Sequence, residues 1–138
     1  QELLFGYRLY WGAEPPARPP LARCVATRTG LGGVIGFRRE RYSQRFAVDF
    51  AGGELAALGA RNATVEAVVE ASRGQVDTVS ARPLHAIDGY RAMFDVYPPD
   101  GSTGQIDIRL YLRHEGRALT ETWLYQWNPP PPEERGLY

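Results

Sequence analysis

The chain has no lysine, a single cysteine and no net charge, and each of these features excludes a class of function. Without lysine, neither Schiff-base chemistry nor a phosphate-binding P-loop is available. Cys24 on its own excludes an internal disulfide and a cysteine-rich metal site. Sixteen basic and sixteen acidic residues cancel, which argues against a protein that binds nucleic acid through bulk charge. No apolar run approaches the roughly 18 residues of a membrane-spanning helix.

The length of 138 residues is enough for one domain of ordinary size and too small for two. A chain of this length buries roughly two-thirds of the surface that its unfolded form exposes, so it needs no disulfide or metal to hold a core. It begins with Gln1 rather than methionine and shows no signal-peptide pattern. We therefore expect a processed chain or a piece of a longer protein.

Alternation of apolar and polar residues with a period of two runs along most of the chain. This period is typical of a strand with one buried and one solvated face. It predicts strands, in chain order, at residues 5–11, 22–29, 46–50, 65–71, 76–81, 90–96, 106–112 and 119–127. The strand at 76–81 is the weakest of these, and only residues 53–58 have a pattern that allows a helical turn.

Glycine-containing turns separate the predicted strands. Ser72-Arg73-Gly74 and Glu115-Gly116-Arg117 are short enough to be hairpin loops. Short strands at this regular spacing predict an all-β fold, an immunoglobulin-like antiparallel β-sandwich of about seven strands with no internal disulfide. We assign the sandwich to residues 1–128. Asn128 is followed by four prolines, so we expect residues 129–138 to form a proline-rich C-terminal tail that has left the sheet.

A glycine-rich run at residues 30–36, followed by Arg38 and Arg39, resembles a dinucleotide-binding loop. Such a loop needs a βαβ unit and a helix whose N-terminus faces the phosphate. No helical period follows the run, so we interpret it as a flexible loop with a basic rim and predict no cofactor.

The histidines and acidic residues do not form a recognisable catalytic or metal-binding pattern. His85 and His114 have no ligand partner at metal-binding spacing, so we predict two surface histidines and no metal site. Asp49, Asp95 and Asp107 fall on the polar faces of predicted strands, together with several arginines. Cross-strand Arg–Asp pairs on a solvated face explain these acids without catalysis, and we predict no catalytic residue.

Glu121 leaves two alternatives open. It shares a face of its predicted strand with the aromatic residues of 123–127. It is either an inward-facing acid paired with an arginine or a strand-end acid near solvent.

Aromatic residues are the most suggestive feature, since they account for 12% of the chain and aromatic faces stack on sugar rings. Tyr97 and Tyr111 fall on polar strand faces, where they form either an exposed platform or a cross-strand pair that stabilises the sheet. Trp127, at the end of the last predicted strand, is a third candidate for contact with sugar. Trp11 and Trp123 are expected to fill the core.

Four segments, in this order, resemble the C-terminal domain of the periplasmic glucan biosynthesis proteins G and D of Gram-negative bacteria. They are residues 7–12 (YRLYWG), 27–30 (TRTG), 45–53 (RFAVDFAGG) and 121–127 (ETWLYQW). The resemblance runs from about Phe5 to Trp127, most of the chain, and the last segment is its most specific part.

The resemblance implies a role in making osmoregulated periplasmic glucans, which are branched β-glucans with a β-1,2-linked backbone. Family members are exported with a cleaved signal peptide, so the resemblance implies a periplasmic location. A large N-terminal β-sandwich carries the substrate cleft and the acids of a chemistry similar to that of β-1,2-glucanases, and a smaller immunoglobulin-like domain accompanies it. None of those acids maps onto this chain, so the resemblance implies a domain that is not an enzyme.

The same resemblance implies the large N-terminal domain as a partner, with β-glucan and the membrane glucan synthase as further candidates. No nucleic-acid partner is expected, because the net charge is zero. Arg38 and Arg39 are candidate contacts with the partner domain or the synthase. One alternative is a free-standing carbohydrate-binding module for β-glucan that uses Tyr97, Tyr111 or Trp127. Another is an enzyme that uses Glu121 and an aspartate.

Overall fold

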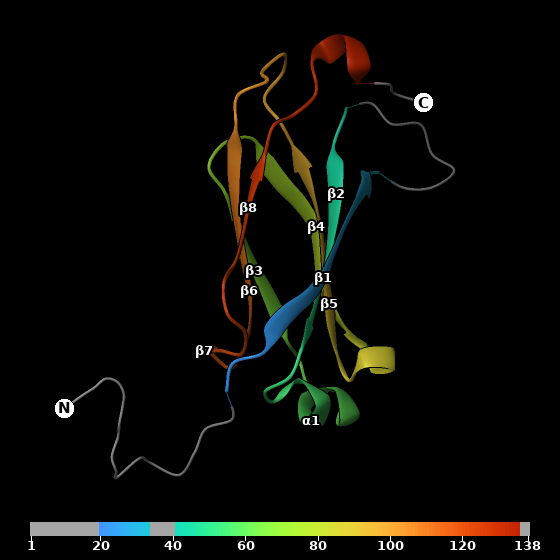
Figure 1. Cartoon of the computed structure of the whole chain (residues 1–138), viewed down its shortest axis with the longest axis vertical. Helices are drawn as coiled ribbons and strands as arrows, with labels where there is room; N and C mark the ends of the chain where they lie inside the picture. Colours follow the sequence, from blue (N-terminus) through green and yellow to red (C-terminus); the bar gives the residue numbers. More distant parts are fainter. Residues whose placement is uncertain (1–19, 34–40, 136–138) are drawn as a thin grey trace, which may run out of the picture.

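A computed structural model describes residues 20–33 and 41–135 of the chain (Figure 1). The strands of the described part are β1 (Arg23–Leu31), β2 (Gln44–Ala51), β3 (Glu66–Ala71), β4 (Gln75–Leu84), β5 (Gly89–Tyr97), β6 (Ile106–His114), β7 (Arg117–Ala118) and β8 (Trp123–Trp127). The helices are α1 (Leu55–Ala60) and the short 3₁₀ helices η1 (His85–Ile87) and η2 (Pro132–Glu134). Of these described helices, none has the length and apolar character needed to span a membrane.

The strands form two antiparallel sheets that face each other, with α1 and η1 at one end of the sandwich and η2 at the other (Figure 1). One sheet has the order β1-β2-β5-β4, and in the other β6 lies between β3 and the two successive strands β7 and β8. Apart from the two-residue β7, this is the connectivity of a seven-stranded immunoglobulin constant-type domain. The predicted all-β immunoglobulin-like sandwich of about seven strands is confirmed.

The core lies between the sheets and is made by the apolar residues of the period-two pattern. Its largest contributions come from β2, β5 and β6, where every second residue is apolar and has a buried side chain. The buried residues of these strands are Phe46, Val48, Phe50, Tyr90, Ala92, Phe94, Val96, Ile106, Ile108, Leu110 and Leu112. The core is therefore formed by apolar side chains from the inner faces of both sheets.

Phe46 makes aromatic contacts within its own sheet and across the core. Its ring stacks on Phe94 of the same sheet, with 5.3 Å between ring centroids. Across the core it meets three aromatic rings of β8 edge-on, at 6.1 Å for Trp123, 5.3 Å for Tyr125 and 5.8 Å for Trp127. Such edge-to-face pairs add stabilisation beyond the burial of apolar area.

One of the two predicted hairpins is wrong and the other is confirmed. The loop at Ser72-Arg73-Gly74 does not join paired strands, because β3 pairs with β6 and β4 pairs with β5 in the opposite sheet. The loop at Glu115-Gly116 does join a hairpin, between β6 and β7. Both of its central residues have positive φ, 51° and 77°, which is the geometry of the tight turns that match strand twist.

The predicted strand at residues 119–127 is interrupted, and only residues 123–127 form β8. The reason is Ala22, which comes just before β1 and makes a parallel bridge with Thr120. The Ala22 amide donates to the Leu119 carbonyl at 3.0 Å, and the Glu121 amide donates to the Ala22 carbonyl at 2.9 Å. Residues 119–121 therefore divide their backbone hydrogen bonds between Ala22 and β6, where the Leu119 amide donates to the Leu112 carbonyl at 2.8 Å, and they form no continuous ladder with β6.

Other predicted segments lie partly or wholly outside the described residues. The strand at 5–11 and the segment 34–40 are not described, whereas Gly30 lies in β1. The weakly predicted strand at 76–81 is confirmed and longer than expected, as β4. After β8 the chain leaves the sheet and lies against the sandwich: the Arg135 side chain donates to the Pro130 and Ser102 carbonyls and lies 5.7 Å from the Tyr42 ring centroid.

We expect Phe46→Ala to lower the free energy of unfolding by about 3–5 kcal/mol, because it removes a fully buried ring from the contact between the sheets. Urea unfolding followed by tryptophan fluorescence measures this, since Trp123 and Trp127 both touch the Phe46 ring. Leu124→Ala is the control: that side chain is 69% exposed, and its loss should change stability by about 0.5 kcal/mol or less. Equal effects of the two substitutions would contradict this account of the core.

Candidate functional site

The outer face of the β1-β2-β5-β4 sheet carries a network of arginines and aspartates. Asp95 of β5 lies directly opposite Arg45 of β2, whose Nε and Nη2 donate to the two carboxylate oxygens at 2.8 and 3.0 Å. The Gly33 amide also donates to Asp95, at 3.3 Å, and Arg45 donates to the Gly33 carbonyl at 2.9 Å. This network ties the chain just after β1 to the middle of the sheet.

Asp49 has a similar environment. Arg91, opposite it in β5, donates to both carboxylate oxygens at 2.8 and 3.1 Å, and Arg28 of β1 adds a bond at 3.2 Å. The hydrogen bond from Arg91 lowers the pKa of the Asp49 carboxyl, although burial acts in the opposite direction. A carboxyl group with a lowered pKa is a poor general acid, because it stays ionised and has no proton to donate.

The predicted cross-strand Arg–Asp pairs are confirmed for both aspartates, but the solvated face predicted for them is wrong. Asp49 is 3% exposed and Asp95 is 1% exposed. The reason is that the arginines lie over the carboxylates, with 27% of the Arg45 side chain and 35% of the Arg91 side chain still in contact with solvent. Both carboxylates are therefore occupied by structural contacts.

The remaining acids singled out in the sequence are exposed. Asp107 accepts a hydrogen bond from the Gln105 side chain at 2.9 Å and has no arginine partner among the described residues, so the Arg–Asp pair predicted for it is wrong. Glu121 lies outside β8 and is exposed, which decides between its two alternatives in favour of an acid near solvent. Within the described ranges, no group of three or more histidine, cysteine, aspartate or glutamate side chains is arranged to hold a metal ion.

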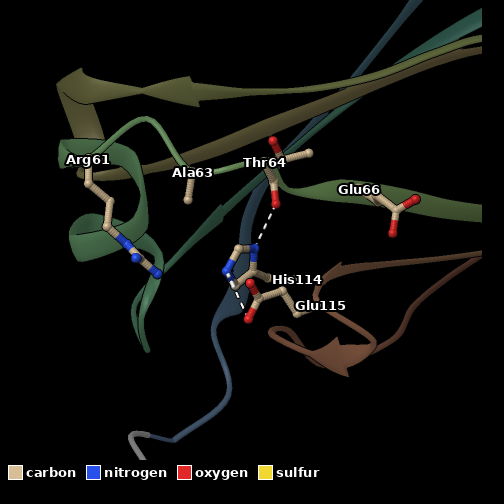
Figure 2. A pocket seen from close by; sticks show the side chains of 6 residues that line it. All are labelled: Arg61, Ala63, Thr64, Glu66, His114 and Glu115. Carbon is tan, nitrogen blue, oxygen red and sulfur yellow. Dashed lines mark hydrogen bonds and ion pairs between the residues drawn. The ribbon is translucent and has the colours of Figure 1, made fainter.

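A surface hollow of the described residues lies near the α1 end of the sandwich, between the α1–β3 connection and the β6–β7 hairpin (Figure 2). It has a volume of about 420 Å³ and is lined by Arg61, Ala63, Thr64, Glu66, His114 and Glu115. Glu66 is already paired with Arg113, whose Nε lies 3.0 Å from a carboxylate oxygen. The hollow combines charged groups of both signs and contains no aromatic ring other than the imidazole.

His114 is the residue of this hollow that sequence reasoning misplaced. We predicted a surface histidine at a hairpin end, yet His114 is only 9% exposed. Its Nδ1 lies 2.7 Å from the Thr64 carbonyl oxygen, and it therefore carries the proton and donates to this carbonyl (Figure 2). Its Nε2 lies 3.7 Å from Glu115 Oε1. His85, in η1, is exposed as predicted.

Another hollow lies on the outer face of the sheet formed by β3, β6, β7 and β8, and it includes Tyr111. It has a volume of about 310 Å³ and is lined by Val68, Glu70, Arg109, Tyr111 and Thr122. Tyr111 lies opposite Val68 in the β3–β6 register, and Arg109 lies opposite Glu70 one pleat further along. The sheet thus brings a tyrosine ring, a carboxylate and a guanidinium together on one face.

Tyr97 and Tyr111 are not neighbours, so the joint platform and the cross-strand pair predicted for them are both wrong. Tyr97 is in β5 and Tyr111 is in β6, and these strands belong to different sheets. Each ring alternates with buried residues of its own strand and so faces away from the core, on opposite sides of the sandwich. The guanidinium of Arg41 lies over the Tyr97 ring, 4.6 Å from its centroid.

The other aromatic and basic candidates divide between the core and the segments that are not described. Trp127 is 9% exposed and lies against Phe46 and Tyr42, which conflicts with an exposed platform at this residue. Trp123 is 7% exposed, which confirms its predicted place in the core. Trp11, Arg38 and Arg39 lie outside the described residues.

We expect the free energy of unfolding to fall as the pH drops below about 5, because the pKa of Asp49 is lowered on folding. The folded chain keeps this carboxylate ionised at pH values where the unfolded chain, with a pKa of about 3.9, takes up a proton. The stabilisation is therefore complete above the unfolded pKa and is lost as the pH falls through the folded one. Urea unfolding between about pH 7 and pH 3 measures this.

Asp49→Asn should cost about 1–3 kcal/mol at neutral pH and flatten the acid side of the profile. Asp107→Asn is the matched control, since its exposed carboxylate contacts an uncharged amide, and it should follow the unsubstituted chain. An Asp49→Asn profile parallel to that of the unsubstituted chain would contradict the assignment.

Comparison with known proteins identifies the family to which these features belong. The periplasmic glucan biosynthesis protein MdoG family matches residues 1–127. Glucans biosynthesis protein D of Xanthomonas axonopodis pv. citri (strain 306) is 70% identical over 139 residues, and that of Stenotrophomonas maltophilia (strain K279a) is 72% identical over 140 residues. Both alignments cover 100% of this chain and 26% of the relative, so the chain spans about a quarter of the length of these proteins. The chain belongs to the MdoG family of periplasmic glucan biosynthesis proteins, as its sequence predicted.

Proposed function

We propose that this chain is a non-catalytic, C-terminal domain of a periplasmic protein needed for the biosynthesis of osmoregulated periplasmic β-glucans. One observation carries the proposal: the whole chain matches about a quarter of proteins named glucans biosynthesis protein D at about 70% identity. The matched quarter has a hydrophobic core of its own, which supports its being a domain. About three-quarters of such a relative lie outside it and are proposed to carry the glucan chemistry.

The pairing and exposure of the acidic side chains support the proposal that the domain is non-catalytic. Glycoside hydrolysis needs one carboxyl that donates a proton and a second that is free to act as a base or nucleophile. Asp49 and Asp95 are buried beneath arginines, and Glu66 is paired with Arg113. Glu121, the acid of the enzyme alternative, stands in solvent.

We further propose that the domain packs on the larger, glucan-processing part of its parent through the start of β1. Leu21 and Val25 are 53% and 56% exposed, and they lie close to the point where the chain enters the described body. Exposed apolar residues grouped in this way favour a contact with another protein surface. Arg38 and Arg39 remain proposed contacts with the partner domain or the membrane glucan synthase.

A free-standing carbohydrate-binding module for β-glucan is the second candidate function. The observation that favours it is the hollow beside Tyr111, which joins an outward aromatic ring to polar side chains.

Removal of this domain from the parent should abolish periplasmic glucan. The test uses a strain that lacks its own glucans biosynthesis protein D and is complemented with a full-length relative, either intact or without the matched quarter. Periplasmic glucan is extracted and quantified, and immunoblotting of the periplasmic fraction checks that both proteins are present. Normal glucan from the truncated protein at normal abundance would count against the proposal.

Substitution of Leu21, just before β1, or of Val25, in β1, should weaken the contact with the parent. We expect Leu21→Asp or Val25→Asp to reduce the affinity of the chain for the separately produced remainder of the relative by about tenfold or more, because each buries a charge in an apolar contact. Leu124→Asp, on the opposite sheet and 69% exposed, is the control and should bind normally. Binding is measured by calorimetry. If Leu21→Asp and Val25→Asp both bind as tightly as the unsubstituted chain, the contact lies elsewhere.

A further inference from the structure

We propose that the hollow beside Tyr111, on the outer face of the sheet formed by β3, β6 and β8, is a subsite that holds glucose residues of a β-linked glucan. The inference rests on the proposed function, which supplies the class of ligand. It gives this domain a direct part in handling the polymer, in addition to its contact with the rest of the parent.

The first support is the state of the Tyr111 ring. Tyr111 is half-buried, so its position is restrained by the sheet, and its side chain has a hydrogen-bonding interaction with the guanidinium of Arg113. Among the described residues, no aromatic ring or guanidinium stacks on the face of the Tyr111 ring. A tyrosine ring has an electron-rich face, and the C–H groups on one side of a glucose ring are an apolar, slightly positive surface that fits against it. Val68, directly opposite in the register, extends the apolar floor.

The second support is the polar rim. Glu70 and Arg109 are direct register partners on β3 and β6, yet no ion pair or hydrogen bond joins them. Their hydrogen-bonding groups are therefore available: the carboxylate accepts from a sugar hydroxyl, and the guanidinium donates to one. Thr122 adds a hydroxyl that does both.

The charge of the hollow also matches a neutral sugar. One carboxylate and one guanidinium line it, so their charges cancel, which suits an uncharged ligand better than an anion or a cation. On the next pleat Glu66 and Arg113 are already paired at 3.0 Å, so their charges are matched to each other. The volume of about 310 Å³ lies at the small end of the range for small-molecule sites.

The other aromatic candidates lack this combination. The Tyr97 ring is covered by Arg41, and Trp127 is packed into the core. The larger hollow beside His114 has two glutamates and no phenol or indole ring. Of the three aromatic residues predicted to contact sugar, Tyr111 is the one that combines an uncovered ring with free polar neighbours.

Titration of the 138-residue chain with a linear β-1,2-linked gluco-oligosaccharide tests the subsite, with ¹⁵N amide shifts as the measurement. We expect shifts confined to residues around Val68, Arg109, Tyr111 and Thr122, with a dissociation constant of about a millimolar or tighter. An α-1,4-linked oligosaccharide of equal length should bind at least several-fold more weakly. The absence of localised shifts at millimolar sugar, or equal binding of both sugars, would overturn the proposal.

Substitutions separate stacking from general disturbance of the sheet. Tyr111→Ala should weaken binding by about tenfold or more, whereas Tyr111→Phe keeps the ring and should stay within about threefold of the unsubstituted chain. Glu70→Gln should weaken binding several-fold. Tyr97→Ala, a tyrosine in an equivalent outward position on the opposite sheet, should have no effect. A Tyr111→Phe loss as large as that of Tyr111→Ala, or an equal loss in Tyr97→Ala, would overturn the assignment.

The outcome is distinguishable from that of the proposed function. If removal of the whole domain abolishes periplasmic glucan but the chain binds no sugar, the proposed function stands and the subsite is overturned. If the chain binds sugar through Tyr111 but its removal leaves glucan production normal, the subsite stands and the proposed function is wrong. Tyr111→Ala in the full-length relative should lower glucan yield without lowering protein abundance, and an unchanged yield would overturn a role for the subsite in the parent.

Discussion

The edge-on contact between Phe46 and the aromatic rings of β8 is the interaction on which the rest of the structure depends. β2 and β8 lie in different sheets and share no backbone ladder, so side-chain packing must hold them together. Once Phe46 points inward, the period of two sends its neighbour Arg45 outward. In the same way, the inward Leu110 and Leu112 send Tyr111 outward. The core therefore decides which groups each outer face presents.

The two outer faces are used differently. On the β1-β2-β5-β4 sheet, each buried carboxylate is paired with an arginine that lies over it, so these polar groups bond one another. On the sheet that contains β3, β6 and β8, Glu70 and Arg109 share a register position without pairing, and no ring or guanidinium stacks on the tyrosine ring beside them among the described residues. A face whose polar groups bond one another favours stability of the fold. A face with unpaired hydrogen-bonding groups favours recognition of a ligand.

The places where sequence reasoning failed all involve contacts between segments far apart in the chain. Residues 119–121 have the alternation of a strand, but two of their backbone hydrogen bonds go to Ala22 and interrupt the ladder with β6. His114 has the position of a hairpin-end residue, but the Thr64 carbonyl binds its ring and buries it. The turn at Ser72 has hairpin residues, but β3 and β4 pair with different strands. Local pattern carries no information about these partners.

The sequence by itself determined the fold class, most strand positions, the Arg–Asp pairing and the family, because the alternation of side chains is local and the family segments are contiguous. The tertiary structure alone decided which strands share a sheet. That choice put Tyr97 and Tyr111 on opposite faces, buried Trp127, and brought Glu70, Arg109 and Thr122 around a single ring. Period two tells only that a side chain faces in or out, whereas a binding site requires knowledge of which outward residues are neighbours, and that is set by packing between strands distant in sequence.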